Sequence, residues 1–276
     1  MLPQWTQNEL IVNGARLHYY RTGNGAKPPL VLAHGFSDDG LCWQPTAADL
    51  ETEYDVIMPD ARGHGLSERV RPGEQVDMAS DLAMIIRKLG LEHPIVGGHS
   101  MGANVAFQLG VRFPDLTRAL VLEDPPWWLS EQAEMRPIDR HEEHPMAGWV
   151  RTIMTHTAEE LMDQCRAEHP TWPEVVVQTW CAAKKRLDPD IISILRIDGN
   201  NWQEKVGAIA CPVLVFTAEV DQGGIITPAV AAKVCELNSY ITIAHIAGVG
   251  HHIRFGNYAA YMQALRSFLA GIRPYR

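Results

Sequence analysis

The sequence predicts an α/β fold in which a mostly parallel sheet is covered by helices on both faces. One observation is a series of short apolar runs typical of buried strands, at residues 30–33, 54–58, 95–98, 119–123, 213–217 and 241–246. A second is that segments with helical periodicity separate most of these runs. Such alternation is typical of a parallel sheet between two layers of helices.

The helical pattern is clearest between Met78 and Leu89. Apolar residues recur there at positions 78, 82, 85, 86 and 89, and Gly90 follows as a stop signal. Residues 228–237 and 258–269 have similar patterns. These segments are the expected helices of the two layers.

A β-hairpin is predicted at the start of the chain. Residues 9–12 and 15–20 flank Asn13-Gly14, a dipeptide favoured in two-residue turns because both central residues need positive φ. Together with the six apolar runs, the hairpin brings the expected sheet to eight strands.

One segment breaks the alternation of strands and helices. Between Pro125 and about Lys205 the sequence shows only helical stretches, at residues 147–156, 158–168 and 174–186. We therefore predict an α/β core domain formed by residues 1–124 and 206–276, and an inserted helical cap formed by residues 125–205.

The predicted cap is rich in tryptophan. It contains six of the eight tryptophans of the chain, and two of them, Trp127 and Trp128, directly follow a predicted strand. Both are candidates for the wall of a substrate pocket. The alternative is that these aromatic side chains only pack the cap onto the sheet.

The charge of the chain argues against two classes of partner. The formal net charge is −9, and no run of lysine and arginine occurs, so we expect neither nucleic acid nor an anionic membrane as a partner. The first residues show no basic and apolar leader, and no run of about 18 apolar residues follows, which predicts a protein that crosses no membrane.

The cysteines predict a reducing compartment. The five cysteines are scattered and include no Cys-x-x-Cys pair, which fits reduced thiols in the cytoplasm. No metal site is expected. His141 and His144 are three residues apart in a charged stretch, whereas the metalloprotease motif spaces its histidines by four.

The stretch Gly98-His99-Ser100-Met101-Gly102 predicts the chemistry. It lies between a predicted strand and the predicted helix 103–113, which is the context of a nucleophile elbow. Glycines two residues before and after the serine avoid contacts that a Cβ would make in so sharp a turn. Ser100 is thus a candidate nucleophile.

A serine nucleophile needs a histidine to accept its proton and a carboxylate to orient that histidine. In an open parallel sheet these groups lie beyond the carboxyl ends of strands. Asp221 follows the strand at 213–217, and His251 follows the strand at 241–246. The order of the three residues along the chain, Ser100, Asp221 and His251, differs from the order in the chymotrypsin-like and subtilisin-like serine proteases.

These motifs together resemble the α/β-hydrolase fold family. Leu32-Ala33-His34-Gly35-Phe36 is similar to its oxyanion loop, the stretch from Asp60 to Ser67 to its loop after the fourth strand, and Gly98 to Gly102 to its elbow. The resemblance runs from the hairpin to the last helix.

The resemblance implies a role for each site residue. Ser100 would be the nucleophile, His251 the general base and then acid, and Asp221 the orienting carboxylate. The backbone N–H groups of Phe36 and Met101 would form the oxyanion hole. The implied reaction requires no cofactor.

Two choices stay open at this point. Some members of the fold carry the acid after the sixth strand, where this chain has Asp124, although Asp221 is the expected one. His252 adjoins His251, and the Gly-x-Gly-His pattern favours His251 as the catalytic ring.

The expected activity is cleavage of a carboxylic ester or lactone of an apolar or aromatic small molecule. Family members that use an aspartate nucleophile, the epoxide hydrolases and haloalkane dehalogenases, do not fit because Ser100 occupies that position. Two alternatives remain. One is a carbon–carbon bond hydrolase acting on a vinylogous diketone, and the other is a ligand receptor that turns over slowly.

Overall fold

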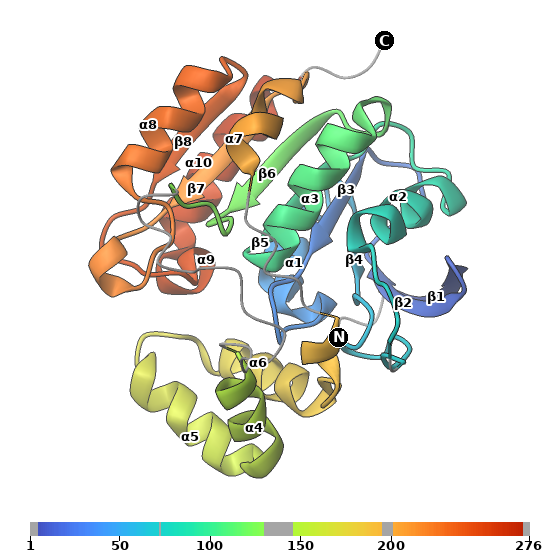
Figure 1. The fold of residues 1–276 in the computed structure, drawn as a ribbon, viewed down its shortest axis with the longest axis vertical. Helices are drawn as coiled ribbons and strands as arrows, with labels where there is room; N and C mark the ends of the chain where they lie inside the picture. Colours follow the sequence, from blue (N-terminus) through green and yellow to red (C-terminus); the bar gives the residue numbers. More distant parts are fainter. Residues whose placement is uncertain (1–4, 72, 130–145, 195–200, 273–276) are drawn as a thin grey trace.

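The computed structural model describes residues 5–71, 73–129, 146–194 and 201–272. Its centre is an eight-stranded sheet of order β1-β2-β4-β3-β5-β6-β7-β8 (Figure 1). The strands are β1 (Thr6–Val12), β2 (Ala15–Arg21), β3 (Pro29–Ala33), β4 (Asp55–Pro59), β5 (Ile95–His99), β6 (Ala119–Glu123), β7 (Val213–Thr217) and β8 (Ile241–His245). The hairpin β1–β2 pairs antiparallel to β4, and the other six strands are parallel.

Helices cover both faces of the sheet, which confirms the predicted fold class. The helices are α1 (Gln44–Leu50), α2 (Met78–Lys88), α3 (Met101–Arg112), α4 (Ala147–Thr155), α5 (Ala158–Glu168), α6 (Glu174–Arg186), α7 (Trp202–Lys205), α8 (Pro228–Leu237), α9 (Ile253–Gly256) and α10 (Tyr258–Gly271). Apolar residues of α2, α3 and α8 pack on one face, and those of α1 and α10 pack on the other. Strands β4 to β7 are fully buried, which is why they read as unbroken apolar runs.

The helices α4, α5 and α6 lie apart from these two layers (Figure 1). Within the described residues, the chain between β6 and β7 contains helices and no strand, as the sequence predicts. The exact division into core and cap stays a prediction. None of the described helices is both long and apolar enough to cross a bilayer.

Each end of the predicted cap segment carries a tryptophan that packs into the core. Trp127 and Trp202 are fully buried, their rings stack with centroids 5.6 Å apart, and Trp127 meets Phe107 of α3 edge to face. The expectation that Trp127 forms a pocket wall is therefore wrong. Its ring fills the layer between the sheet and α3, where stacking and burial stabilise it.

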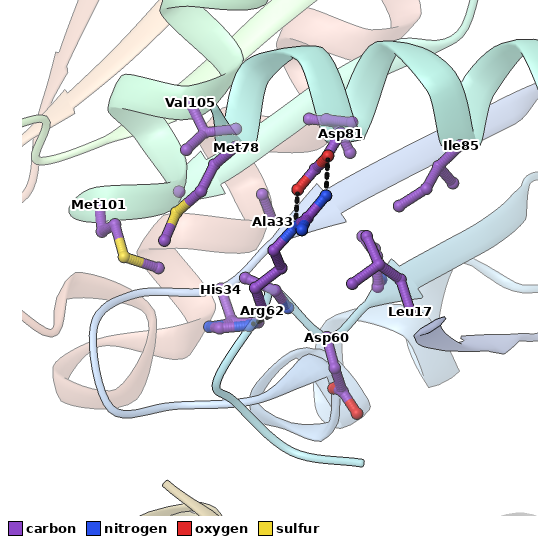
Figure 2. A pocket seen from close by; sticks show the side chains of 14 residues that line it. Leu17, Ala33, His34, Asp60, Arg62, Met78, Asp81, Ile85, Met101 and Val105 are labelled. Atoms are coloured by element: carbon purple, nitrogen blue, oxygen red, sulfur yellow. Dashed lines mark hydrogen bonds and ion pairs between the residues drawn. The ribbon is translucent and has the colours of Figure 1, made fainter. Parts of the chain in front are cut away.

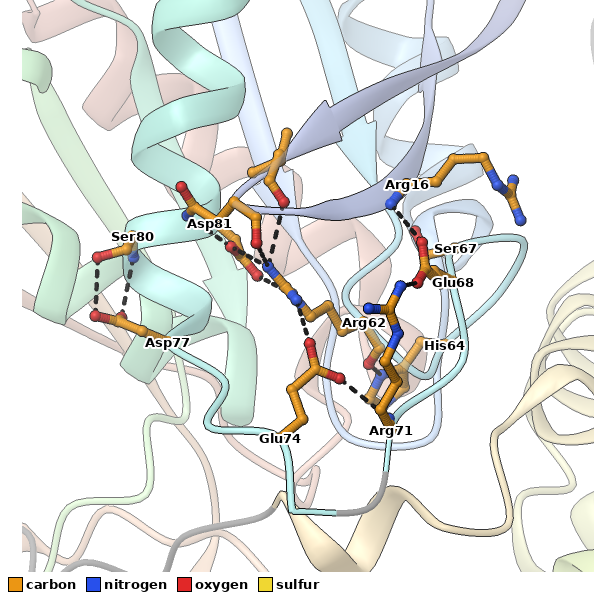
Figure 3. Close-up of polar contacts among 12 residues, drawn as sticks. Arg16, Arg62, His64, Ser67, Glu68, Arg71, Glu74, Asp77, Ser80 and Asp81 are labelled. Atoms are coloured by element: carbon orange, nitrogen blue, oxygen red, sulfur yellow. Dashed lines mark hydrogen bonds and ion pairs between the residues drawn. The ribbon is translucent and has the colours of Figure 1, made fainter.

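A buried arginine joins the hairpin to the body of the fold (Figure 3). Arg62 donates two hydrogen bonds to Asp81 of α2, at 2.7 and 3.0 Å, and a further one to Glu74 at 2.5 Å. It also donates to the backbone oxygens of Val12 and Asn13 in the hairpin turn. The Arg62 side chain is only 7% exposed, so all these contacts are shielded from water.

We expect Arg62→Met to lower the free energy of unfolding by about 3 kcal/mol, because it leaves the buried Asp81 carboxylate without its cation. The measurement is urea unfolding. Arg71→Met is the matched control, since Arg71 is 66% exposed in its pair with Glu68 and its loss should cost less than about 1 kcal/mol. Equal losses in the two variants would contradict the role given to Arg62.

Candidate active site

Ser100 lies at the sharp turn between β5 and α3. Its backbone has φ 52° and ψ −113°, a conformation that non-glycine residues rarely adopt. Its N–H donates to the Glu123 carbonyl at 2.9 Å. Ser100 is thus the only residue between the last residue of β5, His99, and the first residue of α3, Met101.

The two glycines of the elbow are required by close backbone contacts. A Cβ on Gly98 would lie 2.2 Å from the carbonyl oxygen of Gly102, and a Cβ on Gly102 would lie 2.3 Å from that of Ala33. Both distances are too short for any side chain. Consequently the N-terminus of α3 packs directly against the end of β3.

This packing brings two backbone N–H groups toward one place. Met101 is the first residue of α3, so its N–H has no acceptor inside the helix. Phe36 lies in the loop after β3, and its N–H has no hydrogen-bond acceptor within the described part of the chain. Both residues line the same cavity as Ser100, and a pair of such donors can stabilise an oxyanion.

His251 is bound to Asp124 and not to Asp221. The Nδ1–H of His251 donates to Asp124 Oδ2 at 2.6 Å. The fully buried Asp124 carboxylate also accepts from the backbone N–H of Ile225, at 2.9 Å, and of Ile226, at 3.1 Å. Asp124 has φ 45°, so its backbone is strained as well. These hydrogen bonds hold the carboxylate in the orientation that contacts the His251 ring.

The expected acid, Asp221, lies elsewhere. It sits in a short 3₁₀ turn, Val220–Gln222, and its side chain is exposed. After β7 the chain turns at Gly223 and Gly224, so that the next residues pass over Asp124 and present backbone N–H groups there. The geometry therefore corrects the preference for Asp221 and supports the alternative, Asp124.

The neighbouring histidines pack around His251. His252 meets Trp172 edge to face at 5.2 Å and stacks on Phe255 at 6.0 Å. Burial, followed by the nearby His251 ring, lowers the pKa of His252 well below its ordinary value. His99 of β5 donates from Nε2 to the His251 carbonyl at 3.1 Å. Of the two adjacent histidines, His251 is thus the one that contacts the carboxylate.

A cavity of about 520 Å³ opens beside Ser100. This volume lies in the range of small-molecule sites. Residues from the sheet edge and from the cap line it together: Phe36, Ser37, His99, Ser100, Met101, Asn104, Pro126, Trp128, Met146, Trp149, Glu168, His169, Trp180, Lys184, Ile225, His251 and His252. Trp128 is in this wall, as expected, whereas Trp127 is not.

A second, much smaller cavity of about 40 Å³ lies behind the elbow (Figure 2). Met101, Met78 and Val105 border it, and the Arg62–Asp81 ion pair lies at its side. Its volume suffices for a water molecule or two but not for a substrate. The cavity beside Ser100 is the candidate substrate site because both Ser100 and His251 line it.

No group of three or more metal-binding side chains occurs within the described residues. The stretch from His141 to His144, which we interpret as a charged segment, lies outside the described residues.

The model of the alpha/beta hydrolase fold family matches residues 28–255 of this chain. The chain belongs to the α/β-hydrolase fold family. This confirms the resemblance that the sequence motifs indicated.

Individual relatives have different activities. The chain is 28% identical over 269 residues to N-formylmaleamate deformylase of Pseudomonas putida, covering 93% of this chain and 94% of the deformylase. It is 32% identical over 157 residues to a soluble epoxide hydrolase of a Corynebacterium species, covering 56% of this chain and about half, 52%, of that enzyme. The solved structure of an enol-lactonase from Burkholderia xenovorans LB400 matches 95% of this chain and all of its own, with a TM-score of 0.74 and 20% identity. That last likeness shows the shared fold.

Some parts of this α/β hydrolase site were not predicted from the sequence. The backbone N–H groups of Ile225 and Ile226 leave no signal in side-chain patterns. The buried ion pair between Asp38 and Lys184 was also missed, with Nζ and Oδ1 2.5 Å apart. A signal for it exists, because Asp38-Asp39 follows the oxyanion-loop motif and Lys184-Lys185-Arg186 ends a predicted cap helix.

We expect Asp124→Asn to reduce kcat for a hydrolysed substrate by about 10³–10⁴-fold, since the amide cannot stabilise the charged imidazole. Asp221→Asn is the matched control and should stay within twofold of the wild type. The measurement is steady-state hydrolysis of an aryl ester. The reverse pattern would return the role of the acid to Asp221.

His64 is fully buried, and its ring packs against those of His34 and Phe36 in the loop after β3. Its Nδ1–H donates to the Arg62 carbonyl at 2.8 Å, and its ring centroid is 4.8 Å from that of His34. Burial, followed by repulsion from His34, lowers the pKa of His64 from 6.5 to about 3. Between these two values the unfolded chain binds a proton that the folded chain does not, so stability decreases as the pH falls below about 6.5.

We expect His64→Asn to weaken this pH dependence, because asparagine keeps the donor to the Arg62 carbonyl but cannot be protonated. Between pH 7.5 and pH 5 the wild type should lose about 2 kcal/mol more of its unfolding free energy than the variant. Urea unfolding at the two pH values measures the difference. A variant with the wild-type pH dependence would show that His64 is not a neutral buried ring.

Proposed function

We propose that this chain is a serine hydrolase that cleaves a carboxylic ester or lactone of an apolar or aromatic small molecule through an acyl-enzyme. The observation that carries the proposal is the meeting, at one cavity, of Ser100, the Asp124-bound His251 and two N–H groups that have no acceptor among the described residues. Each of these groups has a defined task in acyl transfer.

The proposed mechanism follows from the position of each group. Ser100 Oγ attacks the carbonyl carbon while its proton passes to His251 Nε2, because Nδ1 is already bonded to Asp124. The negative oxygen of the tetrahedral intermediate is bound by the N–H groups of Phe36 and Met101. His251 then gives the proton to the leaving alkoxide, and a water molecule, activated by the same histidine, releases the acid from Ser100.

The walls of the cavity support an apolar or aromatic substrate. Trp128, Trp149 and Trp180 line it together with the Phe36 ring. Such walls exclude water and stabilise flat or bulky apolar groups by contact. We propose a small molecule as the partner of this site, and neither nucleic acid nor a membrane.

A second candidate reaction is hydrolysis of an amide. The similarity to N-formylmaleamate deformylase covers nearly the whole of both chains, which favours this reaction over those of relatives matched in part. The same residues would serve, with His251 protonating a nitrogen leaving group. The carbon–carbon bond hydrolase stays a further alternative, because it would use the same side chains.

We expect Ser100→Ala to lower kcat for an aryl ester by at least about 10³-fold while thermal unfolding stays close to that of the wild type. A fluorophosphonate should label the wild type and leave the variant unlabelled. Activity retained in Ser100→Ala would rule out the proposed nucleophile.

A panel of aryl esters, lactones, N-acyl amides and ring-opened dienones separates the candidate reactions by their rates. Repeated turnover at about 1 s⁻¹ or faster supports an enzyme. One slow burst per Ser100, with no faster substrate, would favour the receptor alternative.

A further inference from the structure

The cap binds the loop after β3 through two buried carboxylates. We call residues 34–39 the oxyanion loop. Lys184 Nζ donates to Asp38 Oδ1 at 2.5 Å, and Arg186 donates from Nε to Asp39 Oδ2 at 2.9 Å and also from Nη2. Both cations belong to the last turn of α6. Two successive residues of the loop are therefore tied to one cap helix.

A third contact joins the cap to Ser37, the residue before Asp38. Trp149 of α4 directs its indole N–H to Ser37 Oγ, at 3.4 Å. The Phe36 side chain packs on an apolar cluster to which the cap contributes Val150 and Ile153 and the core contributes Val70. Ser37, Asp38 and Asp39 thus each have a polar contact with the cap.

The oxyanion loop needs such support because its backbone is strained. Ser37 has φ 62°, a left-handed conformation that costs of the order of 1–3 kcal/mol in a residue other than glycine. Ser37 stands directly between the Phe36 amide and Asp38. A change at Asp38 therefore acts on the peptide groups that orient the Phe36 N–H.

The Lys184–Asp38 ion pair is buried deeply enough to fix the position of the oxyanion loop relative to α6. Each side chain is only 2% exposed. Burial by itself raises the Asp38 pKa, but the Lys184 ammonium, aided by His252 and Arg254, lowers it below its ordinary value. An ionised carboxylate in this place is stable only beside its cation, so the position of α6 decides where the loop can lie.

We propose that Lys184 and Arg186 are positioning residues, which hold the oxyanion loop through Asp38 and Asp39 so that the Phe36 N–H faces the reacting oxygen. This rests on the proposed function, because it takes Ser100 as the nucleophile beside that N–H. The cap then completes the oxyanion hole, in addition to enclosing the substrate.

The test is Lys184→Met, with kcat and KM for an aryl ester and the rate of Ser100 phosphonylation by a fluorophosphonate as readouts. We expect kcat and the phosphonylation rate to fall about 10²-fold, as when one oxyanion donor is lost, and KM to change less than threefold. Phosphonylation needs no knowledge of the natural substrate. Lys184→Arg should recover part of the lost rate.

Lys185→Met is the matched control. Lys185 is the next residue of α6, but its Nζ donates to the Ile153 and His156 carbonyls at the end of α4 and contacts no residue of the oxyanion loop. We expect its kcat to stay within twofold of the wild type.

Two further variants separate positioning from folding. The double variant Asp38→Asn/Lys184→Met removes both charges. We expect it to be thermally more stable than Lys184→Met, while its kcat stays as low as that of Lys184→Met. Arg186→Gln alters a side chain that is 29% exposed, so the variant should fold and lose kcat to a smaller degree.

The outcomes distinguish this proposal from the proposed function. A wild type that does not react with the fluorophosphonate overturns both. A reactive wild type with unchanged kcat in Lys184→Met, or with only a raised KM, overturns the positioning role alone.

Discussion

The close contact between the first turn of α3 and the end of β3 is the constraint on which the site depends. It is possible only because Gly98 and Gly102 carry no side chain. The contact fixes the strained turn at Ser100 and at the same time sets the first N–H of α3 beside the loop that follows β3. The proposed nucleophile and the proposed oxyanion donors therefore depend on one packing arrangement, and a single methyl group at Gly102 would separate them.

The Asp124 carboxylate joins the other strand ends to this arrangement. It stands after β6, accepts two N–H groups from the loop after β7, and orients a histidine from the loop after β8. Neighbouring parallel strands end at one edge of the sheet, so three short hydrogen bonds suffice to fix three loops. The charge-assisted hydrogen bonds to this buried carboxylate offset the cost of its desolvation and help the strained backbone of Asp124 to be tolerated.

Much of the fold could be predicted because its signals are local. The bounds of β6, β7 and α5 agree with the sequence to the residue, and α5 begins at a capping box formed by Thr157 and Glu160. The choice between Asp124 and Asp221 could not be predicted in this way. It depends on the path of the chain through Gly223 and Gly224, which is set by contacts with distant segments. Trp127 was misplaced for the same reason, since its stacking partner, Trp202, is 75 residues away in the printed sequence.

The cap contributes differently through its separate helices. The last turn of α6 binds the oxyanion loop with two ion pairs, whereas α5 contributes Glu168, and His169 just after it, to the cavity wall. Lys184 belongs to both groups, because it also lines the cavity. A change of substrate can be accommodated by replacing other wall residues, such as Trp128, without touching the contacts of Lys184 and Arg186. The contacts of Lys184 and Arg186 join the cap, which forms much of the pocket wall, to the oxyanion loop. This partial separation gives a physical reason why the proposed catalytic arrangement can serve esters, lactones or amides. The proposed reaction depends on the strand ends and the last turn of α6, while the fit of the substrate depends on the other wall residues, Trp180 of α6 among them.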